Sequence, residues 1–482
     1  MRRPSIFISL LLLAFICSTC SKDTEPEMMM EEAPRYFSNT VGIDLESSLL
    51  IYNGTEQNLS IEGEEINFAD TVSQIRLGQA YSVDWQGEAF NFFRTELPII
   101  KIQTRSAQNI DVEYAAAQFN LIEAGEITEW GNLGIRLRGN TSLQFPKKSY
   151  RLELWEDEQG LENRKISLLE MREDDDWLLD GMWNEPLMIR DKGTMDLWLG
   201  FGRVAYQAQE PDLQLGADRH YCELFIDDQY QGLYYLGERL DRKQLKLEKI
   251  SESSDGGELY KAKGWGEAVG GFSIPAVDNN LPSWGNYWIK YPQEPGSYDW
   301  NKLEAFTRFY LEADNETFAT TYSDWIDVDN IIDYFILISL TGAFDNSGNN
   351  IYIARRNQQS NYYFVSWDFD ATFGLGIFGE EIPSPTGFVI HHKLTQRLIN
   401  DDAFRTSLKE RWNALRNGHL TNQNIMQIYT NSYTLLQRNN IYERESLVPR
   451  LDRPLPAFSS LDFLENILNE QLAYLDEYIS TL

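Results

Sequence analysis

Cysteine and histidine are both scarce in this 482-residue chain, which has three cysteines and four histidines. Cys17 and Cys20 lie in the N-terminal apolar segment, so Cys222 stands alone and no framework of internal disulfides can form. Its apolar neighbours predict that Cys222 is an inert core thiol. Two of the histidines are adjacent and would point in different directions on any regular element, which gives little support to a zinc site or a Ser-His-Asp triad. The histidines are His220, His391, His392 and His419.

Positive charge is also in short supply. Lys and Arg number 42 against 74 Asp and Glu, for a formal net charge of -32. No basic patch stands out along the chain, so nucleic acid is not an expected partner, because such a chain repels a phosphate backbone. Aromatic residues are plentiful by contrast, with 13 Trp, 25 Tyr and 25 Phe, and this buriable surface excludes disorder over most of the chain.

Long apolar runs are missing after the first 20 residues. Residues 1–20 combine a basic start, an apolar run too short to cross a bilayer of ~30 Å as a helix, and small residues before Cys20. This is the pattern of a secretory signal. Ser18 and Thr19 ahead of Cys20 resemble a loose lipobox, so Cys20 is the predicted lipidation site.

The next segment, residues 21–35, reads as a polar acidic tether. Its start, Ser-Lys-Asp-Thr-Glu, resembles the export signal of Bacteroidetes surface lipoproteins. We therefore expect an extracytoplasmic protein that is lipid-anchored to the outer membrane and exposed on the cell surface, with the lipid as its one membrane contact. Cleavage and release of a soluble protein is the alternative.

The remaining chain divides into two parts that differ in their pattern of expected strands and helices. Residues 36–94 show short alternating runs separated by Gly, Asn and Asp turns, which predict a small all-β module. Longer strands mixed with helices follow over residues 95–482, and the stretch after Lys393 has the apolar spacing of amphipathic helices. The predicted class is α+β, with a β-rich N-terminal part and a helical C-terminal part.

The most informative cluster runs from FDNSGNN to WDFDATFG. Asp345 and Asn350 have the D-x-x-x-x-N spacing of a phosphotransfer loop, and Asp368 and Asp370 follow a β-rich run. In phosphoryl transfer an aspartate orients the acceptor hydroxyl, while an amide oxygen and a second aspartate hold Mg²⁺ on the nucleotide phosphates. Unpaired carboxylates that end an apolar strand are costly unless a cation is bound. The alternative is structural, since Asp and Asn beside Gly commonly cap helices or form turns.

A second cluster, RGNTSLQFPKKSYRLEL, contains a small polar turn with Asn140 and Ser142, whose backbone amides could approach phosphate. Lys148 enters the returning strand, where its ammonium could reach the same phosphates. Lys261 is a further candidate cation, and Glu238 is a carboxylate that could hold such a lysine. Each of these also fits an ordinary hairpin turn or a surface residue.

Taken together, these segments resemble the CotH kinase family of spore coat protein H-like secreted kinases. The resemblance rests on ordered motifs from about Pro98 to about residue 420. These are IRLRGNTSLQFPKKSYRLEL, DDDWLLDGMWNEPLMIRDKG, CELFIDDQYQGLYYLGERL, VDNIIDYFILISLTGAFDN, YYFVSWDFDATFG and RWNALR.

The resemblance implies an atypical protein-kinase-like fold, ATP with Mg²⁺ or Mn²⁺, and transfer of the γ-phosphate to protein Ser or Thr. It implies a catalytic Asp345 and metal binding by Asp368, with Asn350 and Asp370 as further ligands. The segment WNEPLMIRDKG departs from the family pattern, with Glu-Pro and Asp-Lys where Ser-Leu and Arg-Asn are expected. ERL likewise replaces an expected Glu-Lys. Outside the cytoplasm the scarcity of ATP is an obstacle to this activity.

Two other functions compete. A degenerate kinase-like fold could bind glycans or surface proteins, because Trp265, Trp284 and Trp288 could stack on sugars, although such residues are more often core anchors. A glycoside hydrolase needs two carboxylates flanking a sugar cleft. The acidic candidates for it, Glu380-Glu381 and Asp174 to Asp176, are expected to be solvated in turns.

Overall fold

The structure is a computed structural model that describes residues 39–482 except 57–58, 70–72, 106–109, 252–255, 264–273, 295, 384, 454–455 and 457. The predicted signal, lipidation site and tether, and the predicted Trp265 platform, lie outside the described residues. None of the helices in the described part is both long and apolar enough to cross a bilayer.

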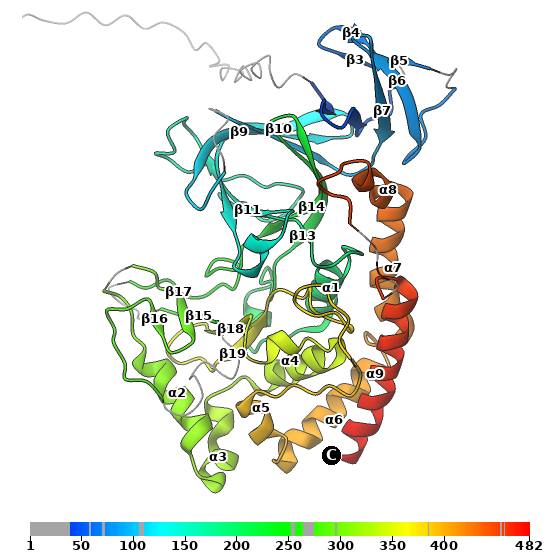
Figure 1. Cartoon of the computed structure of the whole chain (residues 1–482). Helices are drawn as coiled ribbons and strands as arrows, with labels where there is room; N and C mark the ends of the chain where they lie inside the picture. Colours follow the sequence, from blue (N-terminus) through cyan, green and yellow to red (C-terminus); the bar gives the residue numbers. More distant parts are fainter. Residues whose placement is uncertain are drawn as a thin grey trace, which may run out of the picture.

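The N-terminal part is built from strands alone (Figure 1). Five strands form a sheet in the order β1-β2-β7-β6-β5, and a separate hairpin joins β3 to β4. Alternating apolar residues of the sheet pack into one small core that includes Leu50, Val83 and Phe92. The strands are β1 Val41–Asp44, β2 Leu49–Tyr52, β3 Ser60–Ile61, β4 Glu64–Glu65, β5 Asn67–Phe68, β6 Ala80–Trp85 and β7 Glu88–Arg94.

Seven strands then close into a barrel in the order β10-β11-β12-β14-β13-β8-β9. Its strands are antiparallel except for the parallel pair of β8 and β13. Every second residue points inward, and these inward residues, Cys222 among them, form the barrel core. The free thiol of Cys222 is buried there, as predicted. The strands are β8 Ile99–Thr104, β9 Ala115–Glu123, β10 Glu126–Arg138, β11 Ser149–Trp155, β12 Asp176–Asp180, β13 Arg219–Ile226 and β14 Gln229–Glu238.

A second five-stranded sheet lies beside the barrel, in the order β16-β17-β15-β18-β19. Its inner face packs on helices, while its other face turns toward the barrel (Figure 1). The β-rich run that precedes Asp368 in the sequence is strand β19, which pairs with β18 in this sheet. The strands are β15 Glu258–Ala262, β16 Ser283–Trp284, β17 Tyr287–Tyr291, β18 Ile351–Arg355 and β19 Tyr363–Ser366.

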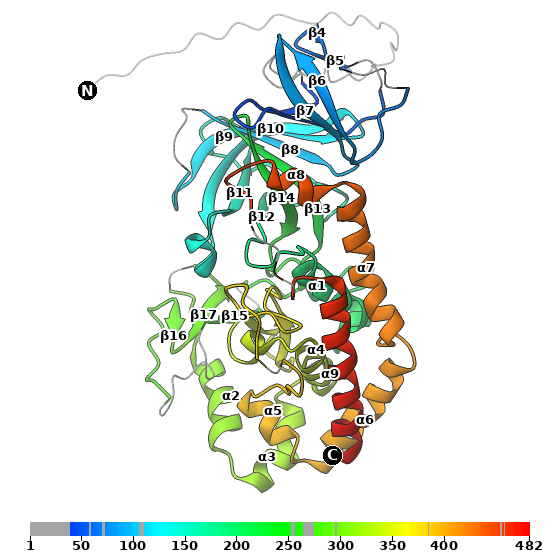
Figure 2. The ribbon, with the colours of Figure 1, turned by 45° about the vertical axis from the view of Figure 1, so that its right-hand side comes forward.

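Helices make up most of the C-terminal part. Figure 2 shows α7 and α9 running along one side of the molecule, with α8 next to the barrel. Short 3-10 turns, η2 to η5, cover Thr141–Gln144, Gln207–Gln209, Tyr322–Asp324 and Phe344–Ser347. The helices are α1 Arg190–Phe201, α2 Asn301–Glu312, α3 Asn315–Thr321, α4 Val328–Thr341, α5 Lys393–Leu398, α6 Asp402–Arg416, α7 Asn422–Arg438, α8 Ile441–Ser446 and α9 Leu461–Thr481.

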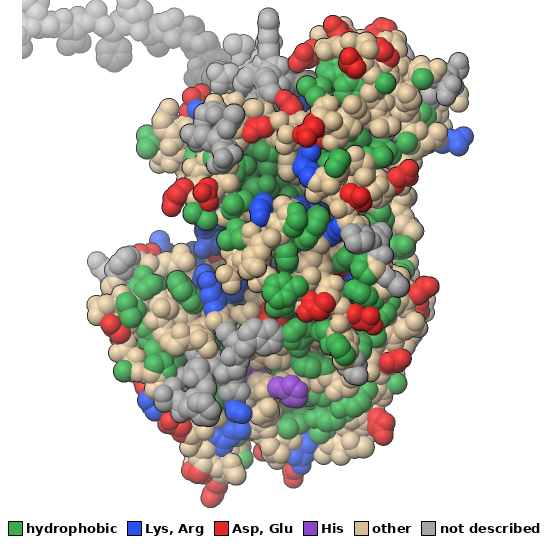
Figure 3. Space-filling model, in the orientation of Figure 1, with side chains coloured by type: hydrophobic (Ala, Val, Ile, Leu, Met, Phe, Trp, Pro, Cys, Tyr) green, Lys and Arg blue, Asp and Glu red, His purple; other side chains and the backbone are tan. Residues whose placement is uncertain are grey.

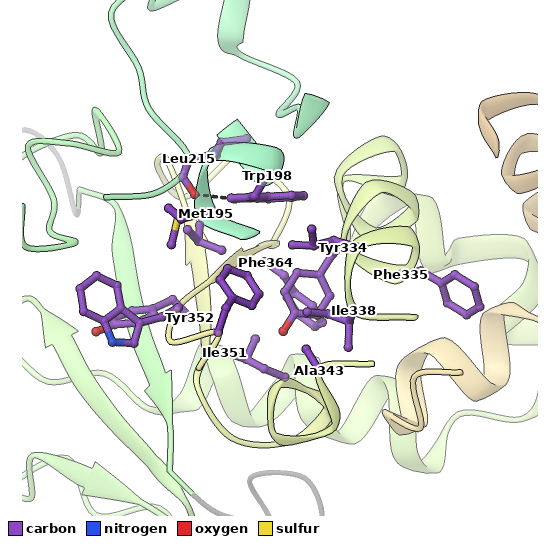
Figure 4. Close-up of a cluster of buried hydrophobic side chains, with 14 of the residues drawn as sticks. Met195, Trp198, Leu215, Tyr334, Phe335, Ile338, Ala343, Ile351, Tyr352 and Phe364 are labelled. Carbon is purple, nitrogen blue, oxygen red and sulfur yellow. Dashed lines mark hydrogen bonds between the residues drawn. The ribbon is translucent and has the colours of Figure 1, made fainter. Parts of the chain in front are cut away.

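Helix α4 is the centre of the largest core. Asp327 caps its start by accepting a hydrogen bond from the backbone N–H of Asn330, and Gly342 ends it in a left-handed conformation with φ 62°. The helix is apolar on nearly every side and is therefore buried. Figure 4 shows Tyr334 and Ile338 of this helix among side chains from β18, β19 and α1, including Trp198.

These elements confirm the predicted α+β class, with an N-terminal all-β region and helices in the C-terminal region. The proposed boundary between units at residues 94 and 95 stays a prediction. A rigid α4 matters for function because the loop that follows it begins at Ala343, where the first candidate site residues occur.

Candidate functional site

A small cavity of about 180 Å³ lies between the outer face of the barrel and the second sheet. Figure 3 shows Lys and Arg side chains gathered in the hollow between these two parts of the molecule. The cavity is lined by Arg136, Arg138, Arg151, Leu178, Arg239, Leu240, Lys261, Tyr352 and Trp367. Five of these nine residues are cations, in a protein whose net charge is -32.

Strand register explains why the cations meet. Arg136 on β10 lies opposite Arg151 on β11, and Arg151 lies opposite Leu178 on β12. Their immediate neighbours, including Ile135 and Leu152, point into the barrel core, so the arginines must point out of it. On the barrel side, the cavity is thus lined by the side chains of β10, β11 and β12 that point away from the barrel core.

This cluster corrects the expectation that the chain has no basic patch. The five cations are spread over residues 136–261, so no window of sequence contains them together. A usable signal was nevertheless present: the alternation of GIRLRG and YRLEL places charge on one face of each arm. The expectation that nucleic acid is not a partner remains a prediction.

Asp345 occupies the loop that follows α4, within η5, and is buried. Asn350 Nδ2 donates to Asp345 Oδ2 at 2.7 Å, and Asn349 Nδ2 reaches both carboxylate oxygens at 3.2 Å. Burial raises the pKa of Asp345, and the hydrogen bond from Asn349, nearby Lys261 and the hydrogen bond from Asn350 oppose that rise. The predicted D-x-x-x-x-N pair therefore forms a direct contact that fixes the direction of the carboxylate.

Asp368 lies just beyond β19 in a left-handed conformation, with φ 68°. Strain of this kind in a residue other than glycine is concentrated at functional sites. Among the described residues, no group hydrogen-bonds to its carboxylate or forms an ion pair with it. Burial and the nearby Asp191 raise the pKa of Asp368 to about 6.

Asp370 extends the acidic end of the site. Asn184 Nδ2 donates to its carboxylate, and burial followed by the charge of Asp368 raises the pKa of Asp370 well above its ordinary value. The acidic end of the site thus has two carboxylates whose negative charge is disfavoured by burial.

Lys261 on β15 lies between the arginines of the cavity and the aspartates of the site, because it lines the cavity and also interacts electrostatically with Asp368. Burial lowers the pKa of Lys261 to about 8, while the charge of Asp368 acts in the opposite direction. Its Nζ lies 5.4 Å from the ring centre of Tyr352 and 5.9 Å from that of Trp367. Among the described residues, no carboxylate is within salt-bridge distance of Lys261. Its ammonium group is thus free to bind an anion.

A buried ion pair holds the loop that contains Asp368. Asp191 on α1 pairs with Arg219 on β13, and it also accepts hydrogen bonds from the Phe369 N–H at 2.7 Å and from the Tyr235 hydroxyl. The guanidinium of Arg219 lies 5.3 Å from the ring centre of Trp367. Sequence reasoning missed this pair.

The Glu-Pro and Asp-Lys pairs that depart from the family motif each supply a carboxylate with a structural role. Glu185, in the unexpected Glu-Pro, pairs with buried Arg190 at 2.7 Å and accepts hydrogen bonds from the backbone N–H groups of Ile189 and Arg190 at the start of α1. Asp191, in the unexpected Asp-Lys, pairs with Arg219. Each departure introduces a carboxylate, and each carboxylate neutralises a buried arginine.

The polar turn with Asn140 and Ser142 follows directly on Arg138, so it lies next to the cavity without being part of its lining. Lys148 donates to the backbone carbonyls of Leu143 and Phe145, at 2.8 and 2.6 Å. The ammonium of Lys148 is therefore used to close the turn. Its predicted contact with phosphate stays a prediction, and Lys261 is the lysine that lines the cavity.

Glu238 has other partners than the lysine it was expected to hold. It ends β14, accepts from Gln244 Nε2 at 2.6 Å and from the Arg172 backbone N–H at 3.1 Å, and lies near the Arg172 guanidinium at 3.7 Å. The described residues thus contain no Lys261–Glu238 ion pair. The physical reason is that donors from the loop before β12 and from the segment after β14 already bind the Glu238 carboxylate.

The residues considered for competing functions have structural surroundings. Trp284 is buried and stacks on Tyr287, with ring centres 6.2 Å apart, whereas Trp288 is 41% exposed. Asp174 was expected to be solvated, but it is buried and paired with Arg172 at 2.7 Å.

Asp176 likewise belongs to a salt-bridged strand, since it binds Arg151 and Arg239 at 2.6 Å. Glu380 and Glu381 are exposed, as expected. His392 is buried and caps α5, where its Nδ1 accepts a hydrogen bond from the Leu394 N–H.

The fit of a divalent metal can be judged from the donor set. Within the described part of the chain, no three Asp, Glu, His or Cys side chains are grouped as a complete metal site. Asp368 and Asp370 supply two carboxylates, and the charge of Asp368 acts on Asp370. Asn350 uses its amide nitrogen to bond Asp345, which leaves its amide oxygen for another ligand. Mg²⁺ commonly uses one or two carboxylates and completes its shell with phosphate and water, so this set suits a metal that arrives with a nucleotide.

Comparison with known proteins agrees with this geometry. A family model described as CotH kinase protein matches residues 135–478, most of the chain. This match assigns the chain to a kinase-like class of proteins. The chain is a member of the CotH kinase family, as its ordered motifs indicated. The inner spore coat protein H of Bacillus subtilis (strain 168) is 21% identical over 325 residues, which is 65% of this chain and 76% of the relative.

Proposed function

We propose that this protein transfers the γ-phosphate of ATP to Ser or Thr of a protein acceptor in a metal-dependent reaction. One observation carries the proposal: a cavity lined by five cations ends at Lys261, and Lys261 lies in the electrostatic field of both Asp345 and Asp368. An anion bound by the cations would therefore have a buried carboxylate beside it that can orient a hydroxyl group.

The roles of the residues follow from their positions. Arg136, Arg138 and Lys261 bind phosphate oxygens, because charge-assisted hydrogen bonds to phosphate are strong. Asp345, held by Asn349 and Asn350, accepts a hydrogen bond from the acceptor hydroxyl. The raised pKa of Asp345 makes its carboxylate a stronger base, so it can better accept the proton that the hydroxyl gives up.

Asp368 and Asp370, with Asn350, would hold Mg²⁺ or Mn²⁺. When bound, the metal offsets negative charge on the phosphates. Burial and the charge of Asp191 raise the pKa of Asp368, and burial and the charge of Asp368 raise the pKa of Asp370, which is an electrostatic situation that a divalent cation relieves.

For the location we propose a lipid-anchored protein on the outer-membrane surface, attached through Cys20. The support is the pattern of residues 1–35 alone. Metabolic labelling with a fatty acid, compared between the full chain and its Cys20→Ala variant, tests the anchor. Labelling of both variants equally would contradict it.

The direct test of activity uses γ-labelled ATP with Mg²⁺ or Mn²⁺ and a generic acceptor protein. Transfer is expected in the full chain and should fall at least about a hundredfold in Asp345→Ala and in Asp368→Ala. Glu410→Ala, on the exposed side of α6, is the matched carboxylate control and should keep full transfer. A nucleotide-dependent rise in melting temperature should accompany activity in the parent chain.

No transfer and no thermal shift would favour the binding alternative, in which a degenerate site serves a glycan or a surface protein. Exposed Trp288 keeps that alternative worth testing. A glycan array with the full chain and Trp288→Ala would then be the next measurement.

A further inference from the structure

The cationic surface continues beyond the cavity over the open face of the second sheet. Lys261 on β15 is in register with Trp288 on β17. Their neighbours Tyr260 and Tyr287 are buried, so Lys261 and Trp288 share the opposite face. Lys263 directly follows the end of β15, and Lys290 lies on β17 two residues after Trp288, so the antiparallel pairing places these two lysines on opposite sides of the Lys261–Trp288 pair.

Lys290 interacts electrostatically with Lys263 and with two arginines of the cavity. Burial, followed by the charges of Lys263, Arg239 and Arg151, lowers the pKa of Lys290 to about 8. The Nζ of Lys263 lies 4.5 Å from the ring centre of Trp288. Among the described residues, neither Lys263 nor Lys290 has a carboxylate within salt-bridge distance. Repulsion among them is therefore left uncompensated.

A nucleotide does not account for all of this charge. In the cavity itself, Asp176 already bonds Arg151 and Arg239, and Asp180 bonds Arg138, so three of the arginines are partly neutralised. Lys263 and Lys290 lie outside the cavity lining. They form a second anion-attracting surface, the β17 surface, defined by Lys263, Trp288 and Lys290.

We propose that the β17 surface binds the acceptor and that this acceptor is an acidic peptide, with Asp or Glu residues near the Ser or Thr that is modified. The inference rests on the proposed function, which supplies the reason for a peptide near Asp345. Charge complementarity selects the occupant: the chain as a whole carries a net charge of -32, whereas this surface carries two lysines without a carboxylate partner among the described residues, so it attracts an acidic peptide. Trp288, 41% exposed, adds an aromatic contact for the peptide.

The test measures binding of three fluorescent serine peptides of equal length, one acidic, one neutral and one basic, to the full chain by anisotropy. The acidic peptide should bind at least tenfold more tightly than the other two, and its affinity should fall as salt rises. The double variant Lys263→Gln/Lys290→Gln should lose about tenfold in affinity for the acidic peptide.

The control is Lys393→Gln/Lys409→Gln, which makes the same charge change on α5 and α6 and should leave the affinity unchanged. Equal binding of all three peptides, or equal loss in the control, would overturn the inference. So would tight binding of heparin without binding of the acidic peptide, because the surface would then serve a polyanionic glycan.

The ATP thermal shift separates this inference from the function on which it rests. Lys263→Gln/Lys290→Gln should keep the shift of the parent chain. A parent chain with a normal ATP shift and no preference for acidic peptides would refute the acceptor class alone. A parent chain without an ATP shift would refute the proposed nucleotide function, whatever the peptides do.

Discussion

At the residue scale, the site is a set of charges whose partners are incomplete. Lys261 lacks a carboxylate partner among the described residues, and Asp368 lacks any hydrogen-bond donor there. Other buried charges among the described residues are neutralised by direct pairs, such as Glu185 with Arg190 and Glu223 with Arg444. Charged groups removed from water without partners reduce stability, so two such groups that interact electrostatically beside one cavity indicate a function rather than a fold requirement.

Replacing Lys261 by Met tests whether its unpaired charge serves nucleotide binding or the stability of the fold. The variant should lose the ATP-dependent thermal shift because the cavity loses its free ammonium group. It should unfold at the same or higher urea concentration than the parent, since an apolar side chain of similar length avoids the cost of burying a charge. Urea unfolding and thermal shift measured side by side check both. A large loss of stability would mean that Lys261 is structural.

His392 gives a prediction about pH. Burial lowers the pKa of His392 to about 4, so between about pH 6.5 and pH 4 the unfolded chain binds a proton that the native chain does not. Stability must therefore fall as the pH drops through this window, by about 3 kcal/mol from this group. The measurement is urea unfolding at pH 7 and pH 4.5.

His392→Asn is the matched variant, because Asn can also accept the hydrogen bond that caps α5. It should show a smaller decrease in stability between the two pH values than the parent does. An identical pH dependence in both proteins would contradict the assignment to His392.

At the element scale, the site is assembled by loops that rigid elements hold in place. The loop after α4 is tied to the loop after β19 through Asn346, which donates to the Trp367 carbonyl at 2.8 Å. The loop after β19 is in turn held by Asp191 of α1. A helix, a barrel strand and two loops thus share one network, which sets the position of Asp368.

Asp191→Asn should therefore damage both stability and activity. It leaves Arg219 buried without its counter-ion, which costs about 3 kcal/mol, and it weakens the hold on the Phe369 N–H. Adding Arg219→Met should restore most of the stability by removing the unpaired charge, while phosphate transfer stays low. Recovery of full transfer in the double variant would show that Asp191 does not position the loop.

At the scale of the whole molecule, the C-terminal helices connect parts that lie far apart in sequence. Helix α7 packs on α1, α9 packs on α4, and α8 packs on barrel strand β14 (Figure 2). Arg444 of α8 forms a fully buried ion pair with Glu223 of β13, and Thr95, next to the N-terminal sheet, donates to the same carboxylate at 3.1 Å. This network connects the C-terminal helices, the barrel and the N-terminal sheet.

Glu223→Gln should lower the free energy of unfolding by about 3 kcal/mol because the Arg444 charge stays buried without compensation. The double variant Glu223→Gln/Arg444→Met should recover a large part of that loss. Urea unfolding measures the free energies, and hydrogen exchange in β13 and β14 shows whether the barrel loosens. Additive losses in the double variant would contradict the coupling.

The sequence by itself determined the α+β class, the family, the scarcity of cysteine and the Asp345–Asn350 pair, because periodicity, ordered motifs and short spacings are local properties. Only the tertiary structure decided which cations meet. Arg136, Arg151 and Lys261 come together through strand register and through the packing of two separate sheets, and no local pattern encodes either. For the same reason Lys148 and Glu238, plausible from their motifs, have other contacts, while Asp191 gains its importance from a partner on a distant strand.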